Sequence, residues 1–389
     1  MEKFILLTTK DPWLQPSGGT SAFARHLLSA FKNEIAVVSM TSEDLPIGEW
    51  IKREFDNVEI SYLCLGKRDF KKKSIIPVRL HFLFILLKKA KLLNVNEIRN
   101  LYVDTPEAVF ALSNNWESIC YMFHGLSNPI ANGRYKLFQW FGFIFEKIFL
   151  RKLVKISPNC FLAAADNETI SDFYLKTNFN LKIGRIIPFP TRVDQNIFFP
   201  INNVNFLRRE LNINKNNVFT VVGRLAWIKG WDLILDAFKL YYEKYSDSLL
   251  VFVGEGEDRE RIQKKIIQLK LNGNVIITGL LPPNKVAEYI NISDICLVGS
   301  FYEGWSVAMC EMLACGKRIV TTNVSGAHEM VQNGRNGFIV NDRTPADFFI
   351  AIENTMDNIP SSNNISLELS KKYLLRDLKH DLEYYWRIK

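Results

Sequence analysis

From residue 218 onward, short and fully apolar runs alternate with stretches of helical periodicity, and this alternation restricts the fold more than any other feature. The apolar runs are predicted strands, at residues 218–223, 249–254, 275–279, 295–300 and 318–323. Helical patterns follow them, at residues 231–245, 258–270, 284–290 and 306–315. Strands without polar alternation are typical of a parallel sheet covered on both faces. The second half is therefore predicted to be a doubly wound α/β domain.

The first half shows the same alternation less regularly. Its candidate strands lie at residues 4–9, 34–40, 58–65, 101–104, 118–125 and 160–165. A proline-rich segment at residues 187–200, IPFPTRVDQNIFFP, separates the halves and suggests a hinge. A chain of 389 residues is long enough for two domains. We expect an N-terminal domain at residues 1–195, a second at 196–372, and a terminal helix at about 373–389.

Composition is that of a globular protein, with 48% hydrophobic and 23% charged residues. The longest uncharged apolar runs are shorter than a membrane span requires. The opening residues, MEKFILLTT, predict a strand rather than a secretory signal. The six cysteines are scattered and form no pair at metal-ligand spacing, so we expect reduced thiols and a cytoplasmic location.

The net charge of +8 is concentrated in two segments of the first half. Residues 67–91 have a local charge of +8 and residues 134–155 a local charge of +5, so the rest of the chain is net acidic. Such segments suit an anionic surface, either phospholipid or nucleic acid, although a solvated face has the same composition. The sequence has no nucleic-acid-binding module, so nucleic acid is not an expected partner.

Ligands of open parallel sheets bind at the carboxyl ends of the strands, so the loops after the predicted strands are the candidate site. Gly18 and Gly19 precede a helix, where backbone amides can approach an anion; a plain turn has the same pattern. His124 and Gly125 follow another strand. That histidine can reach a ligand, or it can be a buried, hydrogen-bonded core residue.

The loop GRLAWIKG places Arg224 and Lys229 five positions apart after one strand. Arginine offers a planar fork for phosphate oxygens, and lysine a mobile point charge. Together they could clamp one diphosphate, or they could be two solvated surface cations. The sequence has no Asp-x-Asp motif and no cluster at metal-ligand spacing, so a metal ion is not expected.

The stretch FYEGWSVAMCEM, residues 301–312, contains two carboxylates with different surroundings. Glu303 lies in a loop, Ser306 is a candidate N-cap, and Glu311 lies within an apolar helix. The free amides at the helix start could hold a phosphate. A carboxylate in an apolar helix is costly unless paired, and ribose hydroxyls are suitable donors for it. Alternatively, Glu311 forms a buried salt bridge and Glu303 is a surface residue.

Together these motifs resemble the family-4 retaining glycosyltransferases of GT-B architecture, the glycosyl transferases group 1. The quoted motifs are Gly18-Gly19, His124-Gly125, VVGRLAWIKG, FVGEGEDRERI and EGWSVAMCEMLACGKRIVTTNVSGAHEMVQNGRNGFIV. The resemblance is good over residues 217–341 and thin in the first half. It implies an α/β fold of two doubly wound, Rossmann-like domains facing each other across a cleft. The terminal helix would pack back on the first domain.

The resemblance also implies roles for individual residues. The implied donor-binding residues are Gly18, Gly19, Arg224, Lys229, Ser306, Val307 and Glu311. Among them, Arg224 and Lys229 would hold the diphosphate and Glu311 the ribose. Glu303 would contact the transferred sugar, and His124 would line the reacting centre. The anomeric configuration would be retained without a protein nucleophile, cofactor or metal ion.

One departure concerns Thr191 and Arg192, which stand where many relatives carry Asn-Gly before Val-Asp. This difference affects contacts at the hinge or with the acceptor rather than the class of protein.

We therefore expect transfer of a hexose from a nucleotide sugar to a lipid-linked or oligosaccharide acceptor. UDP is the first expectation and GDP-mannose the second, in the assembly of a bacterial surface polysaccharide such as O-antigen, capsule or lipopolysaccharide. The aromatic and basic segment 134–155 is expected to hold the protein peripherally on the anionic inner face of the cell membrane. Otherwise it is an interior helix with outward lysines. The competing functions are a nucleotide-sugar epimerase or hydrolase, and a non-catalytic membrane-surface binding protein.

Overall fold

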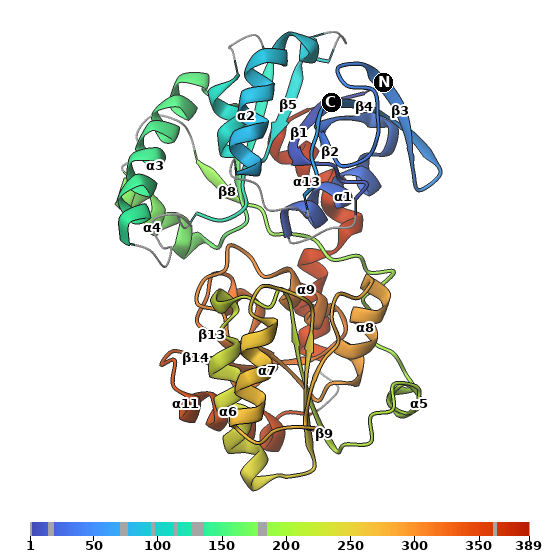
Figure 1. Cartoon of the computed structure of the whole chain (residues 1–389), viewed down its shortest axis with the longest axis vertical. Coiled ribbons are helices and arrows are strands. Elements are labelled where there is room, and N and C mark those ends of the chain that lie inside the picture. The colour runs from blue at the N-terminus through green and yellow to red at the C-terminus, as the bar shows by residue number, and fades with distance from the viewer. Residues whose placement is uncertain are drawn as a thin grey trace. The chain divides into compact units, whose positions relative to one another are not determined.

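The computed structural model describes residues 2–14, 19–70, 77–94, 98–112, 116–126, 136–177, 185–360 and 364–388. The chain divides into two compact α/β units (Figure 1). Unit 1 comprises Met1–Pro190 and Asp377–Lys389, and unit 2 comprises Thr191–Arg376.

Unit 1 is built on an eight-stranded sheet in the order β3-β4-β2-β1-β5-β6-β7-β8. Its strands are β1 Phe4–Lys10, β2 Ile35–Thr41, β3 Trp50–Phe55, β4 Val58–Lys67, β5 Asn100–Val103, β6 Ser118–Phe123, β7 Cys160–Ala163 and β8 Ile186–Pro188. Every pairing between these strands is parallel except that of β3 with β4. Because β1 and β2 are buried along almost their whole length, they form the apolar centre of the unit.

The helices of unit 1 cover this sheet. They are α1 Gly19–Phe31, α2 Val78–Lys89, α3 Lys136–Ile156, α4 Asn167–Thr177 and the C-terminal α13 Leu378–Trp386, with a 3-10 helix η3 at Pro106–Phe110. The predicted terminal helix does pack on unit 1. The indole nitrogen Nε1 of Trp386 donates to Ser118 Oγ at 2.8 Å, and its ring lies 5.2 Å from that of Phe4.

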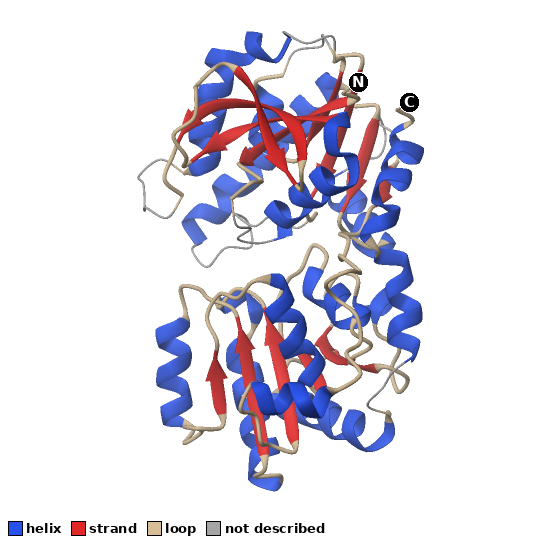
Figure 2. Ribbon diagram, turned by 90° about the vertical axis from the view of Figure 1, so that its right-hand side faces the viewer, coloured by secondary structure: helices blue, strands red, loops and turns tan. Residues whose placement is uncertain are grey.

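Unit 2 contains a six-stranded, fully parallel sheet in the order β11-β10-β9-β12-β13-β14 (Figure 2). The strands are β9 Asn217–Val222, β10 Ser248–Val253, β11 Val275–Ile277, β12 Ile295–Val298, β13 Arg318–Thr322 and β14 Gly337–Val340. The helices are α5 Val204–Glu210, α6 Trp231–Lys244, α7 Arg259–Gln268, α8 Pro283–Ile292, α9 Val307–Ala314, α10 Ala327–Met330, α11 Pro345–Asn358 and α12 Asn364–Ser370. The chain builds outward from β9 to β11, then returns to β12 on the other side of β9. The topological switch point therefore lies between β9 and β12.

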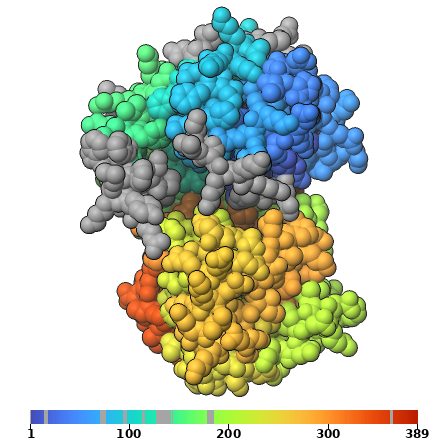
Figure 3. Space-filling view, viewed as in Figure 1, coloured from blue at the N-terminus to red at the C-terminus, as the bar shows by residue number. Residues whose placement is uncertain are grey.

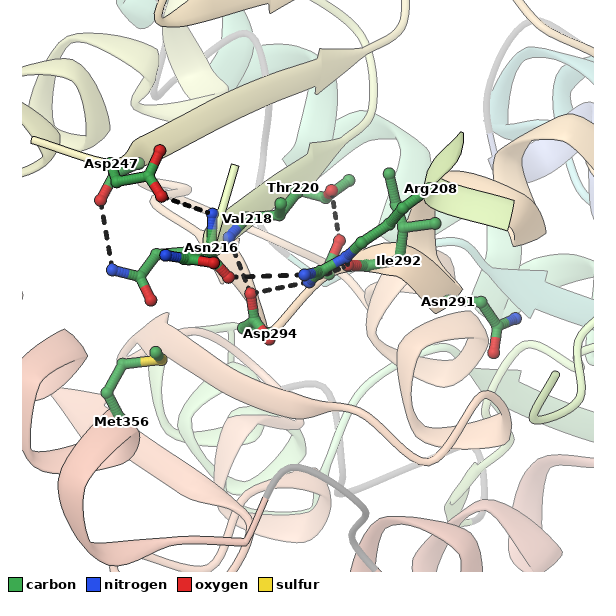
Figure 4. A network of polar contacts seen from close by, with 12 residues as sticks. Arg208, Asn216, Val218, Thr220, Asp247, Asn291, Ile292, Asp294 and Met356 are labelled. Carbon is green, nitrogen blue, oxygen red and sulfur yellow. Dashed lines mark hydrogen bonds and ion pairs between the residues drawn. The ribbon is translucent and has the colours of Figure 1, made fainter. Parts of the chain in front are cut away.

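The amino edge of this sheet is closed by a polar network (Figure 4). Arg208 Nη2 donates to Asp294 Oδ2 at 2.9 Å and to the carbonyl oxygen of Ile292 at 2.7 Å. The same carboxylate oxygen accepts the amide of Val218 at 2.7 Å. At the amino edge, therefore, the charged side chains of Arg208 and Asp294 bind the backbone and stabilise unit 2.

The predicted doubly wound α/β class is confirmed, and so are all the strands named from the sequence. Three strands were not predicted. Strand β3 has exposed polar residues because it lies at the edge of its sheet. Strand β8 lies in the proline-rich segment that was interpreted as a hinge, and β14 follows the turn-forming stretch QNGRN. The structure also divides the chain a few residues before the predicted boundary at 195. The cause is that Val193 donates its amide to the Tyr373 carbonyl at 2.8 Å, and Arg192 Nη1 donates to the Lys372 carbonyl at 2.7 Å.

Candidate active site

The loops that follow β9 and β12 lie on either side of the switch point of unit 2, and they touch. Gly230, in the first of them, has a left-handed φ of 62°. A Cβ at this position would lie 1.8 Å from the carbonyl oxygen of Gly299 in the second loop. The amide of Phe301 also donates to the Ile228 carbonyl at 2.8 Å. Only glycine permits so close an approach of the two backbones.

This contact brings together two of the residues predicted from the sequence. Lys229 Nζ lies 2.6 Å from Glu303 Oε1, and Ser300 Oγ donates to the same oxygen at 2.6 Å. The Glu303 side chain is only 11% exposed. Glu303 is therefore not a surface carboxylate but a largely buried one, oriented by a cation and a hydroxyl.

Arg224, which shares the β9 loop with Lys229, lies apart from this pair. Its side chain is 64% exposed, and its Nε lies 4.0 Å from Glu257 Oε2. An exposed pair at this distance has little ordering effect. The structure thus leaves the Arg224 guanidinium able to swing toward a ligand.

Helix α9 begins where the sequence predicts. Ser306 is its N-cap, and the Ser306 hydroxyl accepts the amide of Met309 at 3.3 Å. The cap leaves the amides of the first helical residues, beginning with Val307, without an intrahelical acceptor. These amides and the helix dipole make the start of α9 positively polarised, and Glu303, which pairs with Lys229, lies in the loop just before the cap.

Glu311 lies further along α9 and is half-buried. Its carboxylate has no hydrogen-bond or ion-pair partner among the residues that the structure describes, so the structure shows no salt bridge there. Desolvation raises the pKa of Glu311 to about 8. A side chain of this kind is suited to accept hydrogen bonds from a ligand that also replaces the missing solvation.

In unit 1, His124 follows β6 and is mostly buried. Its Nε2 lies 3.6 Å from Asp104 Oδ2 and has no hydrogen-bond partner within the described part of the chain. Asp104 is held in turn by the hydroxyl of Thr105 at 2.8 Å. Gly19 is the exposed first residue of α1, whereas Gly18 lies outside the described residues.

Sequence reasoning did not identify Ser300, Thr322 or Arg343. The Thr322 hydroxyl donates to the Ser300 carbonyl at 2.7 Å, and Arg343 Nη1 donates to the same carbonyl at 2.6 Å. A usable signal was their position at the carboxyl edge of the sheet: Thr322 ends β13, and Ser300 and Arg343 follow the ends of β12 and β14 within a few residues. For Arg343 that signal depends on β14, which was not predicted. Over the described ranges, no group of three His, Cys, Asp or Glu side chains is arranged to hold a metal ion.

Comparison with known proteins matches part of unit 2 to a family model. The family model described as glycosyl transferases group 1 matches residues 203–368, which lie within unit 2. An uncharacterised glycosyltransferase of Methanocaldococcus jannaschii is 33% identical over 139 residues, covering 35% of each chain. Mannosylfructose-phosphate synthase of Agrobacterium fabrum is 23% identical over 207 residues, covering 51% of this chain and 45% of that protein. The chain thus matches less than half the length of either relative.

Solved structures match both units. Sucrose-phosphate synthase of Thermosynechococcus elongatus aligns with a TM-score of 0.80 at 16% identity, covering 100% of this chain and 98% of that one. HepE of Anabaena, in complex with UDP and glucose, aligns at 0.71 and 14% identity, covering 99% of each chain. WaaG, a glycosyltransferase involved in lipopolysaccharide biosynthesis, aligns at 0.73 and 14% identity, covering 98% of this chain and 99% of that one. This chain therefore has a glycosyl transferases group 1 domain within the two-unit α/β fold of a GT-B glycosyltransferase.

Proposed function

We propose that this chain is a retaining glycosyltransferase that transfers a hexose from a nucleotide sugar to a lipid-linked or oligosaccharide acceptor. One observation supports this most strongly. Lys229 and Glu303 meet at 2.6 Å at the switch point of unit 2, just ahead of the start of α9, and the unpartnered Glu311 lies on the same helix. A nucleoside-diphosphate sugar has a diphosphate and the hydroxyls of its ribose and sugar. A cation and free amides can bind the diphosphate, and the two carboxylates can accept hydrogen bonds from the hydroxyls.

The donor would be held by these groups in sequence. Arg224, Lys229 and the amides at the start of α9, beginning with Val307, would bind the diphosphate. Glu311 would accept the ribose hydroxyls, and Glu303 the hydroxyls of the sugar. As the glycosidic bond breaks, negative charge grows on the leaving diphosphate. Lys229 and the helix dipole are placed in advance to stabilise that charge, so the proposal requires no metal ion.

We propose retention without a protein nucleophile, and the way in which Glu303 is held supports the absence of a nucleophilic role for this carboxylate. Its Oε1 already interacts with Lys229 and Ser300, which stabilises the anion and lowers its reactivity as a nucleophile. In the proposed reaction the acceptor oxygen attacks the anomeric carbon on the face that the leaving phosphate vacates. A phosphate oxygen takes up the acceptor's proton. The contributions of Gly19 and His124, which the family resemblance implies, stay predictions.

UDP is the first choice of nucleotide because HepE, a structural neighbour, was solved with UDP and glucose. A GDP-mannose donor is the second choice, which the mannosylfructose-phosphate synthase among the sequence relatives favours. WaaG, whose described role is lipopolysaccharide biosynthesis, supports the assembly of a bacterial surface polysaccharide as the setting.

Titration with UDP tests the donor site through Arg224. Replacing Arg224 with alanine is expected to raise the Kd for UDP about 10-fold, because an arginine–phosphate contact is lost. Thermal stability should not change, since the side chain is 64% exposed. Isothermal titration calorimetry measures the Kd, and Arg209→Ala, on the exposed helix α5, is the matched control. UDP binding that is equally tight in both variants would exclude Arg224 from the site.

We propose further that α2 and α3 form a membrane-docking surface on a cytoplasmic, peripheral protein. Both helices pack on η3. Exposed apolar side chains project from them, namely Leu80, Phe84 and Leu87 of α2 and Ile144 and Ile148 of α3. Exposed basic residues lie among them, namely Arg79, Lys88, Lys147, Arg151 and Lys155. The surface of α2 is seen in cyan in Figure 3. No described helix is long and apolar enough to cross a bilayer.

Vesicle binding checks this surface. Phe84→Ser combined with Leu87→Ser removes two side chains that are each 54% exposed, and it should lower sedimentation with anionic vesicles severalfold. The control is Ile267→Ser in unit 2, which removes an apolar side chain of α7 that is 62% exposed. The surface is wrongly assigned if the double variant and the control sediment alike.

A further inference from the structure

Arg343 lies in the turn between β14 and α11, and it binds the loop after β12 at two points. Its Nη1 donates to the Ser300 carbonyl at 2.6 Å, and its Nη2 donates to the Gly299 carbonyl at 2.8 Å. The planar guanidinium thus spans two successive carbonyl groups, which a lysine ammonium cannot do with the same geometry.

The same guanidinium also packs against the next residue of that loop. Its Cζ lies 3.7 Å from the ring centroid of Phe301. The ring of Trp227, from the β9 loop, also packs on Phe301, with 5.5 Å between the ring centroids. A Cβ on Gly230 would lie 2.9 Å from Arg343 Nη2. Arg343 therefore lies where the β9 loop and the β12 loop meet.

Burial makes this position costly for a cation. Arg343 is half-buried, and desolvation lowers the pKa of its guanidinium, although an arginine still stays charged at neutral pH. The two carbonyls and the face of Phe301 offset this cost. A residue held in this way fixes the backbone that it binds.

The backbone in question determines the orientation of Glu303. Ser300, whose carbonyl Arg343 holds, uses its hydroxyl to bind Glu303 Oε1 at 2.6 Å. Lys229 reaches that same oxygen from the β9 loop. We propose that Arg343 is a positioning residue for the Lys229–Glu303 pair: it holds the β12 loop at the place where Ser300 and Lys229 can share one carboxylate oxygen. This inference rests on the proposed function.

If Arg343 had a purely structural role, its replacement would lower the Tm without a specific loss of kcat. Arg318 provides the comparison. Arg318 also binds backbone carbonyls, those of Asp294 at 2.9 Å and Ile359 at 2.7 Å, but at the amino end of β13. Both arginines stabilise unit 2, whereas only Arg343 contacts the loop that contains Glu303.

The experiment compares Arg343→Lys and Arg318→Lys in the full chain, with Arg343→Met as a second variant. We expect Arg343→Lys to lower kcat on the order of 10- to 100-fold, because a small displacement of reacting groups has effects of this size. The Kd for UDP should change much less than kcat. Arg318→Lys should lower the Tm but leave kcat unchanged. In crystals of Arg343→Met, Lys229 Nζ and Glu303 Oε1 should lie beyond ion-pair distance.

Two results would overturn the inference. One is an unchanged kcat in Arg343→Lys, and the other is an intact Lys229–Glu303 pair in the crystal of Arg343→Met. If the wild type turns over no nucleotide sugar, the proposed function fails instead, and the crystal structure alone decides whether Arg343 positions the pair.

Discussion

Replacing Lys229 with alanine should lower kcat/KM for nucleotide-sugar turnover about 100- to 1000-fold, the range observed when one preorganised group for a developing charge is removed. Lys229 is one of the cations proposed to bind the leaving diphosphate, and its Nζ lies 2.6 Å from Glu303 Oε1. Its loss removes charge stabilisation from the diphosphate and also frees Glu303 to change position. Initial rates of nucleotide release, measured with the sugar nucleotide that the wild type uses, give the effect.

The matched control is Lys239→Ala. Lys239 also forms a lysine–glutamate pair in unit 2, with Glu243 at 3.1 Å, but on the outer surface of α6. A surface pair of this kind has little effect on stability and should have none on turnover. Equal activity of Lys229→Ala and Lys239→Ala would contradict the proposed site.

The Tm distinguishes the role of the Lys229–Glu303 pair in stability from its role in turnover. In Lys229→Ala, the Glu303 carboxylate is left 11% exposed without its cation, so the Tm should fall. Adding Glu303→Gln removes that unpaired charge and should restore most of the Tm, whereas activity stays lost. This difference identifies Glu303 as a carboxylate retained for function rather than for folding.

The second large effect concerns Glu311, whose replacement by glutamine should stabilise the protein at alkaline pH and weaken donor binding. Desolvation raises the Glu311 pKa from its ordinary value of 4.5 to about 8. Between these two values the unfolded chain is ionised while the folded chain keeps the proton, so stability falls as pH rises. The loss is complete once the pH exceeds the folded pKa, and it is on the order of 5 kcal/mol. Glutamine has no such titration.

Melting curves across pH measure this difference. The Tm of Glu311→Gln should exceed that of the wild type at pH 8, and the two should converge near pH 4.5. Glu260→Gln, on the exposed start of α7, should follow the wild type. Added nucleotide should raise the Tm of the wild type more than that of Glu311→Gln, because the amide offers the ribose hydroxyls a single, weaker acceptor oxygen in place of the two carboxylate oxygens. Parallel curves for wild type and Glu311→Gln would show that Glu311 is ionised and solvated in the free protein.

The parts of the site that could be predicted from the sequence are those fixed by local chemistry. Ser306 is a helix N-cap because a hydroxyl before an apolar run favours that position, and the structure shows the bond to Met309. The apolar runs likewise predicted β9 and β12, the strands after which the two loops of the site begin. Glu311 was identifiable because a carboxylate is unusual in such a helix.

The remaining features depend on contacts between distant segments. The Lys229–Glu303 ion pair requires the backbones of Gly230 and Gly299 to lie in close contact. The sequence of neither loop alone predicts that contact. Arg343 acts on the β12 loop from beyond β14, a strand that follows a turn-forming stretch and was not predicted. The same limit explains why the sequence left open whether Arg224 is a solvated surface residue, since burial is set by tertiary packing.

The β9 and β12 loops and the start of α9 are proposed above to bind a nucleotide sugar. The most direct measurement is a thermal-shift screen of the wild type and of Lys229→Ala against UDP, GDP, ADP and dTDP and their sugar conjugates. The claim predicts that one nucleotide family raises the Tm of the wild type, with a much smaller rise in Lys229→Ala. Folded wild-type protein whose Tm is unchanged by every one of these ligands would contradict it.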